Sequence, residues 1–308
     1  MIWYRPYREE DRLSCINLYN YIYPKEISGE NWAWRNEKNP AGKAFIETAW
    51  DGDRLVGFCS ILPRVMLCKG RVVPAALSDI AVTHPRYRYR GIFTRLCDRV
   101  YRRVSGEGID FIYGFPSGHS RHGFENKLGW YVCKGRELYR WGGSAGPEKG
   151  IVVMLERDGN QNEQIWESLM GKNWGNVIMA ERSAGYIKWR FFDRPGGDCK
   201  VFAGVLGTGP GGYMVLERGA GGGGIYCDVV DIVAESVSCF RTMIEFAGNF
   251  FEDAQCTRIR IPPNSPYYHC ARAMGFKEGG AVFYFGIKQF GGEAVSPDDW
   301  YYTMADSI

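Results

Sequence analysis

The 308-residue sequence lacks the patterns that mark several common classes of protein. Its ten cysteines include no C-x-x-C pair, and none of its four histidines has neighbours at the spacing of a zinc site. We therefore expect no metal ion and reduced thiols in the core, as is usual in the cytoplasm. No apolar run approaches the roughly 20 residues that cross a bilayer. The N-terminus is charged from the start, so we expect no signal peptide and a cytoplasmic location.

A large excess of charge of either sign is also missing. The formal net charge is +3, which is too small to imply a nucleic acid or membrane partner on its own. The composition, with 45% hydrophobic and 24% charged residues, is that of a globular protein. The length predicts two domains of ordinary size, each able to bury its own core.

An internal repeat runs along the chain. Residues 34–42 (WRNEKNPAG) match residues 189–197 (WRFFDRPGG), at an offset of 155 positions. Further matches follow in the same order: Gly57 with Gly212, 79–82 with 231–234, and 128–130 with 274–276. A collinear series of this kind predicts a tandem duplication.

Both copies predict the same order of elements. In the first copy we expect strands at 2–4, 44–50, 54–66, 71–83 and 110–115, with helices near 9–22 and at 91–105. In the second copy we expect strands at 151–155 and 257–261, helices at 162–170 and 236–251, and a short strand at 214–218 between glycine-rich turns. This order describes an α/β fold (a mixed α+β sheet) in each copy, flanked by helices. The turn-rich segment 142–150 predicts a boundary between domains 1–143 and 150–308.

The segment 77–103 carries the strongest functional signal. An apolar strand ends near Thr83, a tight turn follows, and an amphipathic helix begins near Gly91. Such a junction directs unpaired backbone N–H groups and the positive end of the helix dipole at one point. Gly91 allows a ligand to approach the backbone, and neighbouring arginines add charge-assisted contacts. This pattern indicates an anion site, such as one for a pyrophosphate.

These residues resemble the GNAT superfamily of acyl-CoA N-acyltransferases. The family's pyrophosphate loop has the pattern Q/R-x-x-G-x-G/A, and residues 88–93 read RYRGIF after the family-like VTHP of residues 82–85. The resemblance covers about residues 1–141 and includes Leu-Gly-Trp at 128–130, where the family usually has Leu-Gly-Phe. Phe93 departs from the pattern, because the family has Gly or Ala there.

The resemblance implies acetyl transfer from acetyl-CoA to a primary amine of a small molecule, such as an amino sugar. It also implies that a backbone N–H of the fourth strand, at Ile80, Ala81 or Val82, faces the thioester. The residues that it implies at the cofactor are Ile80, Ala81, Val82, Arg88, Tyr89, Arg90, Gly91, Ile92, Phe93, Thr94, Ser117, His119, Ser120 and Phe124.

Candidate catalytic residues also follow from the resemblance. Asp79 is the candidate base, because family members often carry a carboxylate on this strand. Asp231 matches it in the other copy, which favours a structural role instead. Glu125 stands where many members have a tyrosine that acts as the acid. Tyr131 and Tyr113 are further candidates for that role. His119 or His122 is a further candidate proton carrier.

The second copy has no such loop. After residues 231–234 it reads ESVS, without glycine or arginine, so we expect a degenerate GNAT-like domain. Two other functions stay open: a non-catalytic acyl-CoA-binding or scaffolding protein, and nucleic-acid binding by the seven arginines in 86–103. A homodimer is also left open.

Overall fold

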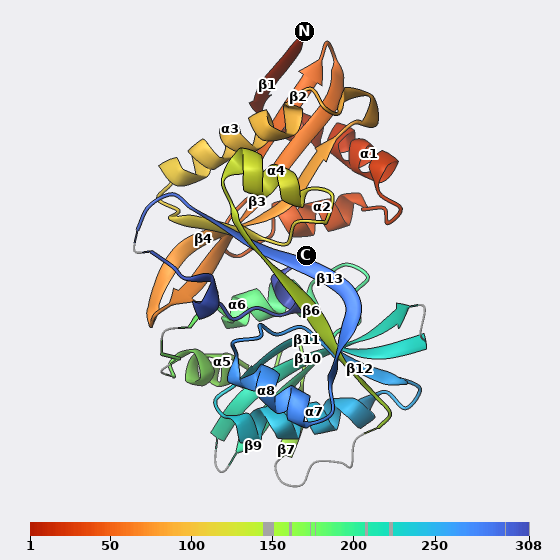
Figure 1. Ribbon diagram of the computed structural model, residues 1–308, viewed down its shortest axis with the longest axis vertical. Helices are drawn as coiled ribbons and strands as arrows, with labels where there is room; N and C mark the ends of the chain where they lie inside the picture. The colour runs from red at the N-terminus through yellow and green to blue at the C-terminus, as the bar shows by residue number, and fades with distance from the viewer. Residues whose placement is uncertain are drawn as a thin grey trace. The chain divides into compact units, whose positions relative to one another are not determined.

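The protein has two compact units in its computed structural model (Figure 1). Unit 1 comprises residues 1–66, 72–133 and 284–295, and unit 2 comprises residues 67–71, 134–283 and 296–308. The structure describes residues 1–143, 151–159, 162–172, 174–175, 177–206, 209–221, 224–292 and 294–307. In this described part, no helix has the length and apolar character needed to cross a membrane.

Unit 1 is a mixed sheet with helices on both faces. Its strands are hydrogen-bonded in the order β1-β2-β3-β4-β5, followed by the end of β13. β1, β2 and β3 pair antiparallel, whereas β4 and β5 pair parallel. The elements are β1 (Ile2–Pro6), a 3-10 turn (Glu9–Asp11), α1 (Arg12–Ile22), α2 (Gly29–Asn36), β2 (Phe45–Asp51), β3 (Arg54–Cys68), β4 (Arg71–Thr83), a 3-10 turn (Pro85–Tyr87), α3 (Ile92–Gly106), β5 (Phe111–Gly114) and α4 (Arg121–Leu128).

Unit 2 repeats this arrangement. Its strand order is β7-β9-β10-β11-β12-β6, and β11 and β12 form the parallel pair. The elements are β6 (Tyr131–Trp141), β7 (Ile151–Leu155), α5 (Asn162–Met170), β8 (Ile178–Ala180), α6 (Ala184–Ile187), a π-helical turn (Lys188–Phe192), β9 (Lys200–Leu206), β10 (Gly209–Gly221), β11 (Gly224–Ala234), α7 (Val237–Phe250), β12 (Cys256–Ile259), α8 (Pro266–Ala273), β13 (Lys277–Gln289) and two 3-10 turns (Pro297–Asp299 and Met304–Asp306).

The predicted fold class, a mixed sheet flanked by helices, is confirmed. Two cores form on opposite faces of the unit 1 sheet: one packs against α3 and α4, and the other against α1 and α2 (Figure 1). The predicted strand 71–83 and helix 162–170 have those bounds in the structure. The two units also have the same register in corresponding strand pairs. Ala49 of β2 pairs with Gly57 of β3, and 155 positions later Gly204 of β9 pairs with Gly212 of β10.

The last strand of each sheet differs from the expectation. Next to β5 lies the end of β13, where Gly286–Gln289 pair antiparallel with Phe111–Gly114. Next to β12 lies β6, the strand that follows α4 in sequence. Each sheet thus takes its last strand from the other half of the chain, whereas we expected contiguous domains 1–143 and 150–308. A sheet edge accepts any segment that satisfies its backbone groups, so sequence order alone does not settle which strand closes it. Most of the expected boundary segment, residues 144–150, lies outside the described residues.

Strand β10 is longer than the expected strand at 214–218, with 13 residues including several glycines. One of these glycines has a packing role. A Cβ atom on Gly212 would lie 2.6 Å from the Val233 carbonyl oxygen and 2.8 Å from Met243 Cε of α7. In unit 1, a Cβ atom on the matching Gly57 would lie 3.0 Å from the Val82 carbonyl oxygen and 3.1 Å from Ile92 of α3. In both units a missing side chain lets the long helix approach the sheet.

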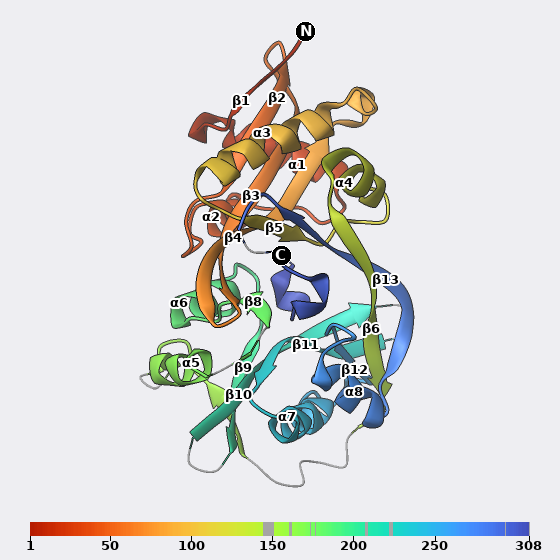
Figure 2. The same ribbon diagram turned by 60° about the vertical axis from the view of Figure 1, so that its left-hand side comes forward.

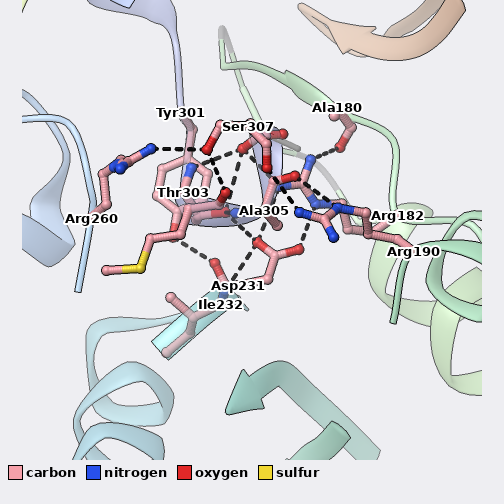
Figure 3. Close-up of polar contacts among 12 residues, drawn as sticks. Ala180, Arg182, Arg190, Asp231, Ile232, Arg260, Tyr301, Thr303, Ala305 and Ser307 are labelled. Carbon is pink, nitrogen blue, oxygen red and sulfur yellow. Dashed lines mark hydrogen bonds and ion pairs between the residues drawn. The ribbon is translucent and has the colours of Figure 1, made fainter. Parts of the chain in front are cut away.

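The C-terminal segment is held in unit 2 by buried charges (Figure 3). Arg182, whose side chain is fully buried, forms ion pairs with Asp231 of β11 and with Asp306, both at 3.0 Å. Thr303 Oγ1 donates to Asp231 at 2.7 Å, and Arg190 donates to the carbonyl oxygen of Ser307 at 2.8 Å. The buried charges of Arg182, Asp231 and Asp306 thus have opposite partners, as burial requires, and Arg190 is held by backbone carbonyl oxygens. The segment therefore ends beside β11 (Figure 2).

Replacing Gly212 with alanine tests this packing. We expect Gly212→Ala to lower the free energy of unfolding by about 1–3 kcal/mol, because the new methyl group overlaps a backbone carbonyl and α7. Gly209→Ala is the matched control on the same strand, since a Cβ atom there meets nothing within 4 Å. Urea denaturation measures both variants, and equal midpoints would contradict the packing role.

Candidate functional site

The parallel pair of unit 1 opens at its end. Pairing between β4 and β5 stops at Ser78 and Gly114, yet β4 continues to Thr83. The two strands therefore separate, and a cavity of about 220 Å³ lies at this place. Its lining residues are Tyr23, Ser78, Asp79, Ala81, Phe93, Gly114, Phe115, Pro116, Ser117, Ser120, Phe124 and Trp130.

Strand alternation decides which β4 side chains reach the cavity. Asp79 and Ala81 line it, whereas Ile80 and Val82 are buried in the core on the α1 and α2 face. Of the three residues predicted to contact a thioester, Ala81 alone has its side chain on the cavity. The predicted contact uses the backbone, so this placement is compatible with it. Six of the predicted site residues line the cavity: Asp79, Ala81, Phe93, Ser117, Ser120 and Phe124.

Asp79 has both a partner and a cavity face. Its side chain is 4% exposed, and its Oδ2 lies 3.5 Å from Arg35 Nε. Arg35 belongs to the repeated Trp-Arg segment, which thus supplies the counter-charge for a buried carboxylate. The matching Asp231 of unit 2 has the same need but meets Arg182 instead. Pairing with an arginine supports a structural role for both aspartates. Asp79 has a second feature, because it also lines the cavity of unit 1.

Tyr23 is a cavity residue that sequence reasoning missed. It is the residue at the C-terminal end of α1, and its side chain is partly exposed, at 40%. Burial of the phenol raises the pKa of Tyr23, and the nearby Asp79 adds to the increase while Arg88 opposes it. The phenol therefore keeps its proton at neutral pH and can donate it. The sequence signal that could have indicated Tyr23 is the tyrosine-proline pair after the first helix. A residue before proline disfavours the helical conformation, so the helix ends there.

The other predicted acids lie elsewhere. Glu125 accepts a hydrogen bond from Arg121 Nε at 2.8 Å, one turn away on α4. Tyr131 is 59% exposed, and Tyr113 is buried in the core. His119 is exposed on the segment that leads into α4, and His122 is exposed on α4 itself. None of these five side chains lines the cavity.

The predicted anion loop lies at the start of α3. Gly91 is the N-cap residue, with φ +75°, and no side chain caps the helix. The first intrahelical bond runs from the Arg95 N–H to the Gly91 carbonyl at 3.1 Å, so the N–H groups of 92–94 have no acceptor within the helix. A Cβ atom on Gly91 meets nothing within 4 Å, and the side chains of 88–90 are exposed. This open, positively charged helix end suits an anion.

Phe93, the departure from the family pattern, has a local explanation. Its ring packs edge-on against Phe124 at 5.4 Å between centroids. It also covers Gly123, where a Cβ atom would lie 2.9 Å from the ring. The ring is thus a wall of the cavity, supported by α4, and it joins the loop to the cavity.

The corresponding helix of unit 2 is closed. Ser236 Oγ accepts a hydrogen bond from the Cys239 N–H at 3.2 Å and so caps α7. The neighbouring Glu235 forms an ion pair with Lys172. A capped helix end beside a carboxylate is unfavourable for an anion, in agreement with the expectation for the second copy.

Two of the arginines proposed for nucleic-acid binding are already paired. Arg99 and Arg103 each hold the buried Glu47 at 2.9 Å. The single carboxylate of Glu47 neutralises half of their combined charge, which leaves less of it for phosphates of a nucleic acid.

Comparison with known proteins agrees with this geometry. Residues 3–133 match the family model described as an acetyltransferase (GNAT) domain. A GCN5-related N-acetyltransferase from Anabaena variabilis has a similar structure at 12% identity, with a TM-score of 0.73 over 94% of this chain and 73% of that chain. A GCN5-related N-acetyltransferase from Kribbella flavida has 15% identity and a TM-score of 0.65, over 94% of this chain and 71% of that chain. Eis1 from Mycobacterium abscessus has 15% identity and a TM-score of 0.62, over 92% and 73%. No curated protein matches the chain.

His84 supports the anion loop and predicts a pH dependence. It is buried at the start of the loop, where its Nε2 lies 2.9 Å from an Arg54 nitrogen and its Nδ1 accepts from the Arg86 N–H. Burial, together with the positive charges of Arg54 and Arg86, lowers the pKa of His84.

The unfolded chain therefore binds a proton at a higher pH than the folded protein does. The stability that neutral His84 contributes is present above about pH 6.5, the unfolded pKa, and is lost as the pH falls towards the lower folded pKa. We expect the free energy of unfolding to fall more between about pH 7.5 and 5 in wild type than in His84→Asn. Urea titrations measure this difference, with His122→Asn, an exposed histidine on α4, as the control. Identical pH profiles for wild type and His84→Asn would contradict it.

Proposed function

Because residues 3–133 of this chain are a GNAT acetyltransferase domain, we propose that the protein transfers the acetyl group of acetyl-CoA to a primary amine of a small molecule. The observation that carries this proposal is that Phe93 belongs both to the anion loop and to the lining of the cavity. This residue lies in the first turn of α3, whose open end suits a pyrophosphate, and its ring lines the cavity between the separated strands. A cofactor bound by its pyrophosphate at the loop would extend its thioester end into that cavity.

The residues present fit coenzyme A. The N–H groups of 92–94 and the arginines at 88 and 90 would hold the pyrophosphate. The cavity of about 220 Å³ lies where β4 extends beyond its pairing with β5, and the thioester and the amine would meet there. Backbone N–H groups of β4 beyond Ser78 would stabilise the developing oxyanion.

The cavity residues supply the remaining chemistry. The amine nitrogen attacks the thioester carbonyl, forming the C–N bond and breaking the C–S bond. The proton leaves the amine for Asp79, directly or through a water molecule, and Tyr23 donates its proton to the departing thiolate. We assign the acid role to Tyr23, in preference to the earlier candidates Glu125 and Tyr131, because it lines the cavity.

An amino sugar is the acceptor class that we test first. Asp79 offers a carboxylate to an ammonium group, and aromatic rings of Tyr23, Phe124 and Trp130 line the same cavity. Aromatic faces favour cations and the apolar faces of sugar rings. These features support a small cationic acceptor.

The anion loop can be tested by binding. We expect wild type to bind one acetyl-CoA per chain, and Gly91→Glu to weaken binding at least roughly tenfold, because it strains a residue at φ +75° and adds negative charge to the site. Gly106→Glu, at the other end of α3, makes the same charge change and should bind as wild type does. Isothermal titration calorimetry measures all three. Equal affinity of the two variants, or two sites per chain, would contradict the assignment.

The acid can be tested by kinetics. We expect Tyr23→Phe to lower kcat about 10²-fold with little change in the KM for acetyl-CoA, because the hydroxyl acts in proton transfer. Tyr21→Phe changes an exposed tyrosine two residues earlier and should leave kcat unchanged. Release of free coenzyme A over a panel of amines and amino sugars gives the rates. Acetyl-CoA binding without turnover on any amine would favour the alternative, a non-catalytic acyl-CoA-binding protein.

A further inference from the structure

A second cavity, of about 340 Å³, lies wholly within unit 2. Its lining residues are Trp174, Val177, Met179, Val233, Glu235, Asn264, Ser265, Pro266, Tyr267, Asp298, Asp299, Trp300 and Tyr301.

The position of this cavity corresponds to that of the unit 1 cavity. Pairing between β11 and β12 stops at Val229 and Ile259, while β11 continues to Ala234. Val233 lines the cavity just as Ala81, its match in the repeat, lines the cavity of unit 1. The same separation of parallel strands thus produces both spaces.

Two tyrosines distinguish the cavity of unit 2 from that of unit 1. Tyr301 donates its hydroxyl proton to the Ile232 carbonyl at 2.6 Å, and Tyr267 donates to the Ala234 carbonyl. Burial raises the pKa of Tyr267 to about 12, so its hydroxyl remains a donor at neutral pH. The two rings lie 5.8 Å apart at 77° and form a fixed corner. The two tyrosine hydroxyls therefore occupy carbonyl oxygens of β11 beyond the end of its pairing with β12.

The charge of the lining is negative. Glu235, Asp298 and Asp299 contribute three carboxylates, and among the described residues that line the cavity there is no lysine, arginine or histidine. Glu235 is neutralised by its ion pair with Lys172, which leaves the two aspartates of the turn before Trp300. The nearby N-terminus of α7 is capped by Ser236, so it offers no site for an anion.

We propose that this cavity binds an organic ammonium ion. Aromatic rings at right angles attract a cation through their faces, and carboxylates at the mouth of the cavity add Coulombic attraction. The apolar residues Val177, Met179 and Val233 accommodate the alkyl groups of such an ion. The site is separate from the acetyl-CoA site of unit 1, so the proposed function does not depend on it.

Choline and its neutral isostere 3,3-dimethylbutan-1-ol test the role of charge, because they share one shape. We expect choline to bind in the millimolar range and the neutral alcohol at least about fivefold more weakly. Nitrogen-15 NMR of the tryptophan indole groups locates the ligand. The signals of Trp174 and Trp300, assigned with Trp174→Phe and Trp300→Phe, should shift, whereas that of Trp3 in unit 1 should not.

Charge-removing variants complete the test. The double variant Asp298→Asn/Asp299→Asn should weaken choline binding at least about fivefold, because it removes both unpaired charges at nearly constant shape. Asp198→Asn changes an exposed carboxylate of unit 2 outside the cavity and should bind choline as wild type does. Circular dichroism confirms that each variant is folded.

Three results would overturn the proposal. The first is no shift of either indole signal with choline at roughly 10 mM. The second is equal affinity for choline and the neutral alcohol, which would indicate an apolar site. The third is choline affinity that is unchanged in the folded double variant.

Discussion

The structure depends on one constraint: in each unit, one strand of the parallel pair extends beyond the other. β4 extends beyond β5 in unit 1, and β11 extends beyond β12 in unit 2. Pairing ends at Ser78 with Gly114 in unit 1 and at Val229 with Ile259 in unit 2. Backbone groups beyond those points have no strand partner on that side, and buried polar groups need one. Tyrosine hydroxyls take this role in unit 2. The corresponding place in unit 1 is a cavity lined by Asp79 and Ala81, so the same separation of strands yields two different cavities.

The N-termini of the two long helices, α3 and α7, also differ between the units. Gly91 is exposed and starts α3 without a side-chain cap, whereas Ser236 caps α7 beside a carboxylate. An anion is therefore favoured at one helix end and disfavoured at the other. This difference supports the proposal of a single acetyl-CoA site, in unit 1.

The matched aspartates show how a repeated residue acquires two roles. Asp231 is fully enclosed by Arg182 and the C-terminal segment, where it stabilises the fold (Figure 3). Asp79 is also paired, with Arg35, but it keeps one face on a cavity. The repeat correctly indicated a structural requirement for this carboxylate. It did not exclude catalysis, because the surroundings of the two residues diverged.

The sequence by itself determined local features: the mixed α/β class, the approximate bounds of the strands and helices that it predicted, and the start of a helix at Gly91. These follow from periodicity, glycine positions and helix-end chemistry within short windows. Only the tertiary structure decided which segments meet. It placed Tyr23 beside Asp79, turned Phe93 onto Gly123, and closed each sheet with a strand from the other half of the chain. Those contacts join residues far apart in sequence, and their energies depend on packing that no local pattern encodes.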